Sequence, residues 1–84
     1  MIDELRERIA EIDRAIVAAV NRRLELVAEL KRYKEEHGID FVDPERERWL
    51  SAHLAETNPG PLSNEGLQRL HAEVLALVKR ELAG

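Results

Sequence analysis

Apolar residues recur at steps of three and four over the first part of the chain, and polar residues fill the positions between them. The apolar positions are Ile2, Leu5, Ile9, Ile12, Ile16, Ala19, Val20, Val27 and Leu30. This spacing places their side chains along one face of an α-helix. No Gly or Pro occurs before Gly38, and the basic residues Lys31, Arg32 and Lys34 precede that glycine, as is typical of the last turns of a helix. We therefore predict one long helix over about residues 2–36.

Two shorter helices are predicted in the rest of the chain. The tripeptide Asp43-Pro44-Glu45 combines an N-cap acceptor, a proline at the first helical position and an acid in the first turn, so a second helix should span about residues 44–56. After the breaker at residues 57–61, Ser63 is placed to cap a third helix over about residues 64–82. The apolar positions of this third helix are Leu67, Leu70, Val74, Leu75, Leu77, Val78 and Leu82. The predicted fold class is all-α, with one very long and two shorter helices in a single domain over residues 1–84.

The predicted first helix is too long for one small domain. A helix of about 35 residues is roughly 50 Å long, whereas a compact domain of this size is about 25–30 Å across. The two short helices cannot cover the whole apolar stripe of the long one. We therefore expect an intertwined helical homodimer, in which each long helix packs along its partner.

The composition of the chain narrows the possible functions. Cysteine is absent, which excludes disulfides, thiolate metal sites and a cysteine nucleophile. The three histidines, His37, His53 and His71, have no metal-ligand spacing, so no metal is expected. A formal net charge of −4 argues against nucleic-acid binding, and no apolar run approaches the length of a membrane span. Because the N-terminus also lacks the pattern of a signal peptide, we expect a cytoplasmic protein.

Charged residues occupy some positions at which the helical pattern calls for apolar ones. Arg23 and Lys34 lie eleven residues, about three turns, apart on the apolar face of the first helix. In the second helix, Glu47 lies three residues before Leu50 and so falls on the same helix face, with Arg46 beside it. Any one of these four charged residues is explained by a long side chain whose charged end reaches solvent, or by a structural ion pair. Several cations on the inner faces of one small domain instead favour a small anionic ligand.

The charged residues belong to an ordered set that resembles the all-helical (AroQ-class) chorismate mutases. The matching residues are Leu5-Arg6-Glu7-Arg8-Ile9 with Ile12-Asp13, Asn21-Arg22-Arg23 with Leu26-Val27 and Leu30-Lys31-x-x-Lys34, and Asp43-Pro44-Glu45-Arg46-Glu47. The resemblance runs over the first 50 residues without a gap and continues more weakly through the third helix. It implies a dimer of three-helix chains with two active sites. It also implies the rearrangement of chorismate to prephenate, the branch step toward phenylalanine and tyrosine.

The resemblance implies roles for three cations on the first helix. Arg6 would reach a substrate carboxylate from the partner subunit. Arg23 would bind a carboxylate within its own chain. Lys34 would hydrogen-bond the ether oxygen of the breaking C–O bond, where negative charge grows during the reaction.

The start of the second helix would hold the other end of the substrate. By the same resemblance, Asp43 and Glu47 would contact or orient the substrate hydroxyl, and Arg46 would support that end of the pocket. A pericyclic rearrangement of this kind needs a dianion held in a compact conformer, but no nucleophile, metal or cofactor. No cofactor is therefore expected.

The third helix departs from the family's pattern. Val78 and Leu82 stand where the family has a small hydroxyl residue and a Gln or Glu, and neither side chain can donate a hydrogen bond. Glu81 lies one residue early, about 100° around the helix, and would reach the pocket only if the register shifts or the last turn unwinds. His71 stands where the family more often has an aromatic core residue. We expect it to be half-buried, with its hydrogen bonds satisfied.

These departures leave other functions open beside a chorismate mutase. One is a weak mutase whose pocket is completed by another enzyme of the aromatic pathway. Another is a related mutase or lyase that acts on 4-amino-4-deoxychorismate or isochorismate. The third is a non-catalytic dimeric module that binds a metabolite or a partner protein.

Overall fold

The computed structural model describes residues 1–83, and these residues form three α-helices joined by loops. The helices are α1 (Ile2–Glu36), α2 (Pro44–Thr57) and α3 (Asn64–Glu81), and no strand occurs among the described residues. The predicted all-α class with three helices is confirmed. The observed and predicted bounds differ by one residue at the C-termini of α2 and α3, where Leu82 is the C-cap of α3.

A glycine ends α1. Gly38 has a φ angle of +65°, in the left-handed region that favours glycine, and its amide donates to the carbonyl of Glu35 at 3.4 Å. The next amide, that of Ile39, donates to the carbonyl of Lys34 at 2.8 Å. The two bonds form a Schellman-type helix end. The chain therefore turns away from α1 at Gly38, and the loop at residues 37–43 passes beside the Lys34 side chain.

Side-chain caps determine where α2 and α3 begin. The Asp43 carboxylate accepts a hydrogen bond from the backbone N–H of Arg46 at 3.1 Å. Ser63 Oγ accepts from the backbone N–H of Gly66 at 3.0 Å at the start of α3. Because Asp43 caps α2, Arg46 and Glu47 lie in the first turn of that helix, close to the loop that follows α1.

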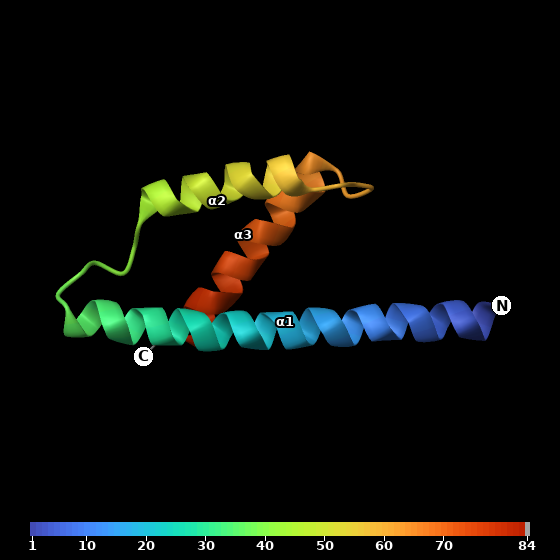
Figure 1. Ribbon diagram of the computed structural model, residues 1–84, viewed down its shortest axis with the longest axis horizontal. Helices are drawn as coiled ribbons and strands as arrows, with labels where there is room; N and C mark the ends of the chain where they lie inside the picture. Colours follow the sequence, from blue (N-terminus) through green and yellow to red (C-terminus); the bar gives the residue numbers. More distant parts are fainter. Residues whose placement is uncertain (84) are drawn as a thin grey trace.

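The three helices form an open arrangement (Figure 1). α2 runs along the direction of α1, and α3 crosses diagonally from the far end of α2 back to α1. Between α2 and α3, Ser51 Oγ donates to Gln68 Oε1 at 2.6 Å. Between α1 and the end of α3, Lys31 Nζ donates to the carbonyl of Leu82 at 3.0 Å. These hydrogen bonds hold α3 against both other helices.

Burial within one chain is confined to α3. Among residues 1–83, only Leu67, His71 and Val78 are buried, and none of them belongs to α1 or α2. The chain extends over 55 × 25 × 17 Å with a radius of gyration of 15.8 Å, compared with about 12 Å for a compact domain of this length. One chain alone therefore forms only a small hydrophobic core.

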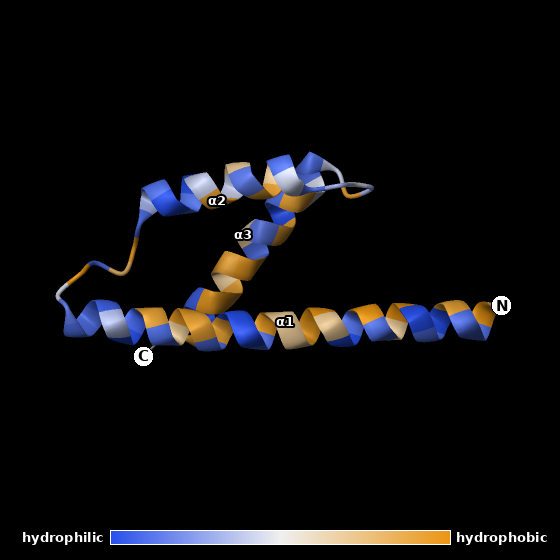
Figure 2. Ribbon diagram, in the orientation of Figure 1, coloured by the Kyte–Doolittle hydropathy of each residue, from blue (hydrophilic) through white to orange (hydrophobic). Residues whose placement is uncertain are grey.

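The N-terminal half of α1 extends beyond the other two helices and leaves apolar residues in contact with solvent (Figures 1 and 2). Ile9, Ile12 and Ile16 have 59%, 62% and 55% of their surface exposed. Side chains of this size gain about 1.5–3 kcal/mol each on full burial. We call the row formed by Ile2, Leu5, Ile9, Ile12 and Ile16 the uncovered face of α1. None of the other residues within 1–83 buries this face. An uncovered apolar stripe on the long helix is the reason for which the sequence predicts a dimer.

Candidate functional site

The main cleft of the chain lies between the C-terminal half of α1, the loop at residues 37–43, the start of α2 and the inner side of α3. Its volume is about 330 Å³, which suits a small molecule. The ionic lining residues are Arg23, Lys34, Asp43, Arg46, Glu47 and Lys79. The remaining lining residues are Leu26, Val27, Leu30, Phe41, Val42, Leu50, His71, Leu75 and Val78.

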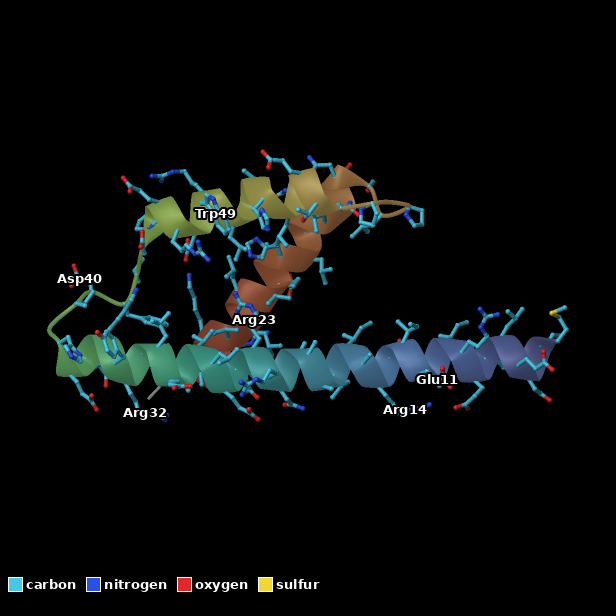
Figure 3. All side chains as sticks on the ribbon, viewed as in Figure 1. Glu11, Arg14, Arg23, Arg32, Asp40 and Trp49 are labelled. Atoms are coloured by element: carbon cyan, nitrogen blue, oxygen red, sulfur yellow. The ribbon has the colours of Figure 1, made fainter. Side chains whose placement is uncertain are left out.

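The cleft is positively charged although the chain as a whole is negative. Four cations and two carboxylates line it, a formal net charge of +2, compared with −4 for the entire chain. The ion pairs within residues 1–83 are Arg14–Glu7, Arg22–Glu25 and Arg69–Glu65, all outside the cleft. The cleft cations therefore remain available to an anion. Figure 3 shows Arg23 on the side of α1 that faces α2 and α3, whereas Arg14 and Arg32 extend from the opposite side.

Lys34 is oriented by the loop that follows α1. Its Nζ donates to the carbonyl of Phe41 at 3.2 Å and lies 5.8 Å from the centre of the Phe41 ring. An ammonium group carries three donors, so this contact leaves two N–H groups for a ligand. The loop thus directs the Lys34 ammonium to the wall of the cleft without consuming its capacity to bind an anion.

Arg46 is held by an aromatic ring on the same helix. Its guanidinium carbon lies 4.0 Å from the centre of the Trp49 ring, and Trp49 in turn stacks on His53 with ring centres 4.7 Å apart and planes inclined by 11°. A guanidinium that stacks through its face keeps its N–H groups in the plane for hydrogen bonds. The stack therefore positions Arg46 at the mouth of the cleft without occupying its donors.

His71 differs from the expectation drawn from the sequence. It is buried rather than half-buried, with 9% of its surface exposed, and its Nε2 has no hydrogen-bond partner within residues 1–83. The expected satisfied histidine is therefore wrong. One turn away on α3, Leu67, Val74 and Leu75 are apolar and offer no partner. Gln68, which lines the same cavity as His71, is hydrogen-bonded to Ser51 and Asn64 instead. A buried polar group without a hydrogen-bond partner destabilises the folded state by about 1–3 kcal/mol. A hydrogen bond to Nε2 from a group of the cleft would therefore stabilise the protein.

A sequence model of one family, described as chorismate mutase type II, matches residues 5–81 of the chain. The chain belongs to the type II chorismate mutase family. It is similar to two bifunctional chorismate mutase/prephenate dehydratases, with 36% identity over 78 residues to that of Stutzerimonas stutzeri and 32% over 77 residues to that of Pseudomonas aeruginosa. Each alignment covers 86% of this chain and 21% of the relative, so the chain spans about a fifth of the length of these two proteins.

The fold of the chain is similar to that of a chorismate mutase from Thermus thermophilus, which has been solved in two forms. Form I gives a TM-score of 0.87 at 32% sequence identity and covers 92% of this chain and 96% of its own. Form II gives a TM-score of 0.88 at 32% identity and covers 96% of this chain and 91% of its own. The three-helix architecture of the family therefore extends over nearly the whole chain.

Most of the site residues predicted from the resemblance to chorismate mutases come together in the cleft. They are Arg23, Lys34, Asp43, Arg46, Glu47 and Val78. They come from α1, the N-cap and first turn of α2, and the inner side of α3, so residues up to 55 positions apart in the sequence line one cavity.

Three of the predicted residues lie elsewhere. Arg6 stands seventeen residues before Arg23, about 25 Å along the helix axis, near the free end of α1. Leu82 lines a separate cavity of about 200 Å³ at the end of α3. Glu81 is exposed and outside the lining of the cleft, because the last turn of α3 does not unwind: the amide of Leu82 still donates to the carbonyl of Val78 at 3.0 Å.

Lys79 is a cleft cation that sequence reasoning missed. It follows Val78 on α3 and lines both the main cleft and the cavity that includes Leu82. The sequence gives little signal for such a role, because a basic residue in the last turn of a helix is already explained by the helix dipole. Its position next to Val78, which the chorismate mutase resemblance selects, is the one feature that points to the cleft.

The described part of the chain offers no metal site. No group of three or more His, Asp or Glu side chains that could hold a metal ion occurs within residues 1–83. None of the helices within residues 1–83 combines the length with the apolar composition that a membrane span needs. Four of the six ionic groups in the cleft are Arg or Lys, whose natural ligands are carboxylates and other oxyanions.

Proposed function

We propose that the chain is a chorismate mutase, an isomerase that converts chorismate to prephenate in the biosynthesis of phenylalanine and tyrosine. The observation that carries the proposal is the cationic cleft, in which Arg23, Lys34 and Arg46 face one small volume. Chorismate is a small dianion, so the charge and the volume of the cleft match its chemistry. Membership of the type II family supports the same reaction.

The cleft would act by holding the substrate and by stabilising charge. In the reaction a C–O bond breaks and a C–C bond forms within one molecule, so no nucleophile, metal or cofactor is required. Arg23 and Arg46 would fix the two ends of the dianion in the compact conformer that brings the reacting carbons together. Lys34 would donate to the ether oxygen as its negative charge grows, an interaction that typically contributes about 3–4 kcal/mol to lowering a barrier.

The remaining walls of the cleft would recognise the neutral parts of the substrate. Asp43 and Glu47, at the cap and in the first turn of α2, would bind and orient the hydroxyl group. Val78 and Leu75 would pack against the carbon skeleton from α3. Lys79 supplies α3 with a donor next to the apolar Val78, where the sequence departs from the family's pattern.

The functional unit we propose is a homodimer. A second chain that packs along the uncovered face of α1 would bury Ile9, Ile12 and Ile16, which one chain leaves exposed. In such an arrangement Arg6 of one chain would enter the cleft of the other and add a further cation to the substrate carboxylates. The distance of about 25 Å between Arg6 and Arg23 along one helix is what requires the second chain.

The reaction can be tested with the purified chain and chorismate, without metal or cofactor. The expected result is loss of chorismate absorbance together with formation of prephenate, which acid converts to phenylpyruvate. A rate equal to that of the uncatalysed rearrangement would overturn the proposal. Release of pyruvate from isochorismate, or turnover of 4-amino-4-deoxychorismate in place of chorismate, would assign the cleft to a related substrate instead.

A further inference from the structure

A second cavity lies next to the main cleft, between the first turns of α2 and the middle of α3. Its volume is about 340 Å³, and its polar lining includes Arg48, Ser51 and Gln68. Only Glu47, His71 and Leu75 line both cavities. Glu47 from α2 and His71 from α3 therefore share the wall between the two volumes, and they are its two polar members.

The polar groups of the second cavity differ in their capacity to accept a hydrogen bond from His71. Gln68 Oε1 already accepts from Ser51, and Gln68 Nε2 is directed to Asn64 Oδ1 at 3.5 Å. Arg48 has donors only. The Glu47 carboxylate accepts no hydrogen bond through its side chain within residues 1–83, and it is the one acceptor that shares both cavities with the imidazole.

We propose that His71 is a positioning residue for Glu47. Its Nε2–H donates to one carboxylate oxygen after a rotation of the exposed Glu47 side chain toward α3. This bond gives the buried, unpartnered Nε2 its partner. It also directs the second carboxylate oxygen of Glu47 into the main cleft, where the proposed function places the substrate hydroxyl. The inference rests on the proposed function for that last step only.

The kinetic test uses two substitutions of His71 that differ in one property. His71→Phe keeps an aromatic ring in the core and removes the donor, whereas His71→Gln keeps an N–H at a similar distance from the backbone. Because Glu47 is proposed to bind a hydroxyl in the ground state and the transition state alike, His71→Phe should raise KM for chorismate about fivefold with kcat nearly unchanged. His71→Gln should restore most of the loss. Equal defects in both variants would show that only packing matters.

A double variant separates positioning from packing. In a Glu47→Ala background, His71→Phe should have no further effect on KM, because the group that it positions is gone. Effects of the two substitutions that multiply independently would overturn the proposal. His37→Phe is the matched control, since His37 lies at the exposed end of α1 with Nδ1 2.8 Å from the carbonyl of Tyr33, away from both cavities.

The hydrogen bond itself can be detected without any turnover. Long-range ¹H–¹⁵N spectra of the free protein resolve its three imidazoles, which can be assigned with the His37→Phe and His53→Phe variants. The His71 Nε2 proton should be observable with slowed exchange in the wild-type chain and lost in Glu47→Ala. An Nε2 proton signal that is unchanged in Glu47→Ala would overturn the inference. If chorismate is not turned over, the proposed function fails while this measurement still decides the His71–Glu47 contact.

Discussion

The guanidinium of Arg46 lies over the ring of Trp49, with 4.0 Å between the guanidinium carbon and the ring centre. The two residues stand one turn apart on α2, and Arg46 alone of the pair lines the cleft. Trp49 remains about half exposed, so the ring does not serve the core of this chain. Its structural effect is to restrict where the Arg46 side chain lies.

Replacement of Trp49 should weaken substrate binding without abolishing turnover. A cation–π contact at an exposed site contributes about 0.5–1 kcal/mol, so Trp49→Leu should raise KM for chorismate about two- to fivefold. Trp49→Phe should lie between wild type and Trp49→Leu, because the smaller ring keeps part of the interaction. Steady-state kinetics of the three proteins provide the measurement. A Trp49→Phe variant as poor as Trp49→Leu would contradict the cation–π explanation.

Trp49 also offers a direct readout of the same contact. It is the only tryptophan of the chain, so tryptophan fluorescence reports on the surroundings of this one ring, which include Arg46 and His53. When a dianion binds the guanidinium that lies over the ring, the emission of Trp49 should change along a saturable curve. The change should disappear in Arg46→Ala, while chorismate still binds through Arg23 and Lys34. A full fluorescence response in Arg46→Ala would show that another group causes it.

Lys34 should contribute more to the rate than to binding. Because its ammonium is proposed to meet charge that develops only in the transition state, Lys34→Ala should lower kcat roughly 100- to 1,000-fold with a smaller change in KM. Arg32→Ala is the matched control, since Arg32 is also a cation near the end of α1 but extends from the opposite side of the helix (Figure 3). A Lys34→Ala variant with kcat within threefold of the control would remove Lys34 from the mechanism.

How much of this site the sequence predicts depends on the element that carries each residue. On α1, the regular three-four pattern alone places Arg23 and Lys34 on one apolar face, and both line the cleft. On α2, the cap at Asp43 fixes the first turn, so the positions of Arg46 and Glu47 follow. In both helices a local rule determines the face on which a side chain lies.

On α3 the sequence predicts less. The regular helix through Glu81 keeps that side chain on the outer side, which its 100° offset from the pattern already indicated. Lys79 could not be distinguished from an ordinary basic residue of a last helical turn. The burial and hydrogen bonding of His71 depend on which residues of α1 and α2 pack against it, and the spacing of residues along the sequence does not contain that information. Tertiary neighbours therefore decide what α3 contributes.

The uncovered face of α1 should be the contact between two chains. Ile12→Asp places a charge in the middle of this face, and burial of an unpaired carboxylate is strongly unfavourable. We expect the wild-type chain to sediment as a dimer and Ile12→Asp to sediment as a monomer or to unfold. Arg14→Asp introduces the same side chain on the opposite side of α1 (Figure 3) and should remain dimeric. A wild-type chain that is monomeric at high concentration would contradict the proposed dimer.

A shared active site makes a distinct prediction for mixed dimers. Arg6→Ala and Arg23→Ala should each inactivate both clefts of a homodimer. If Arg6 acts across the interface, a heterodimer of the two variants has one complete cleft, with Arg23 from its own chain and Arg6 from the other. Refolding the two inactive variants together in equal amounts should then recover about a quarter of wild-type activity, because random pairing makes half of the dimers heterodimers.

The reverse mixture gives the control and excludes a site built within one chain. A chain that carries both Arg6→Ala and Arg23→Ala inactivates both clefts of any heterodimer with wild type. It lacks the Arg23 side chain of its own cleft and the Arg6 side chain that the cleft of its partner needs. An equal mixture should therefore show about a quarter of the activity of wild type at the same total concentration, from wild-type homodimers alone. If each chain used its own Arg6, this mixture would keep about half of the wild-type activity. The mixture of the two single variants would then recover no activity. The distance of about 25 Å between Arg6 and Arg23 along α1 is the structural reason to expect the first outcome.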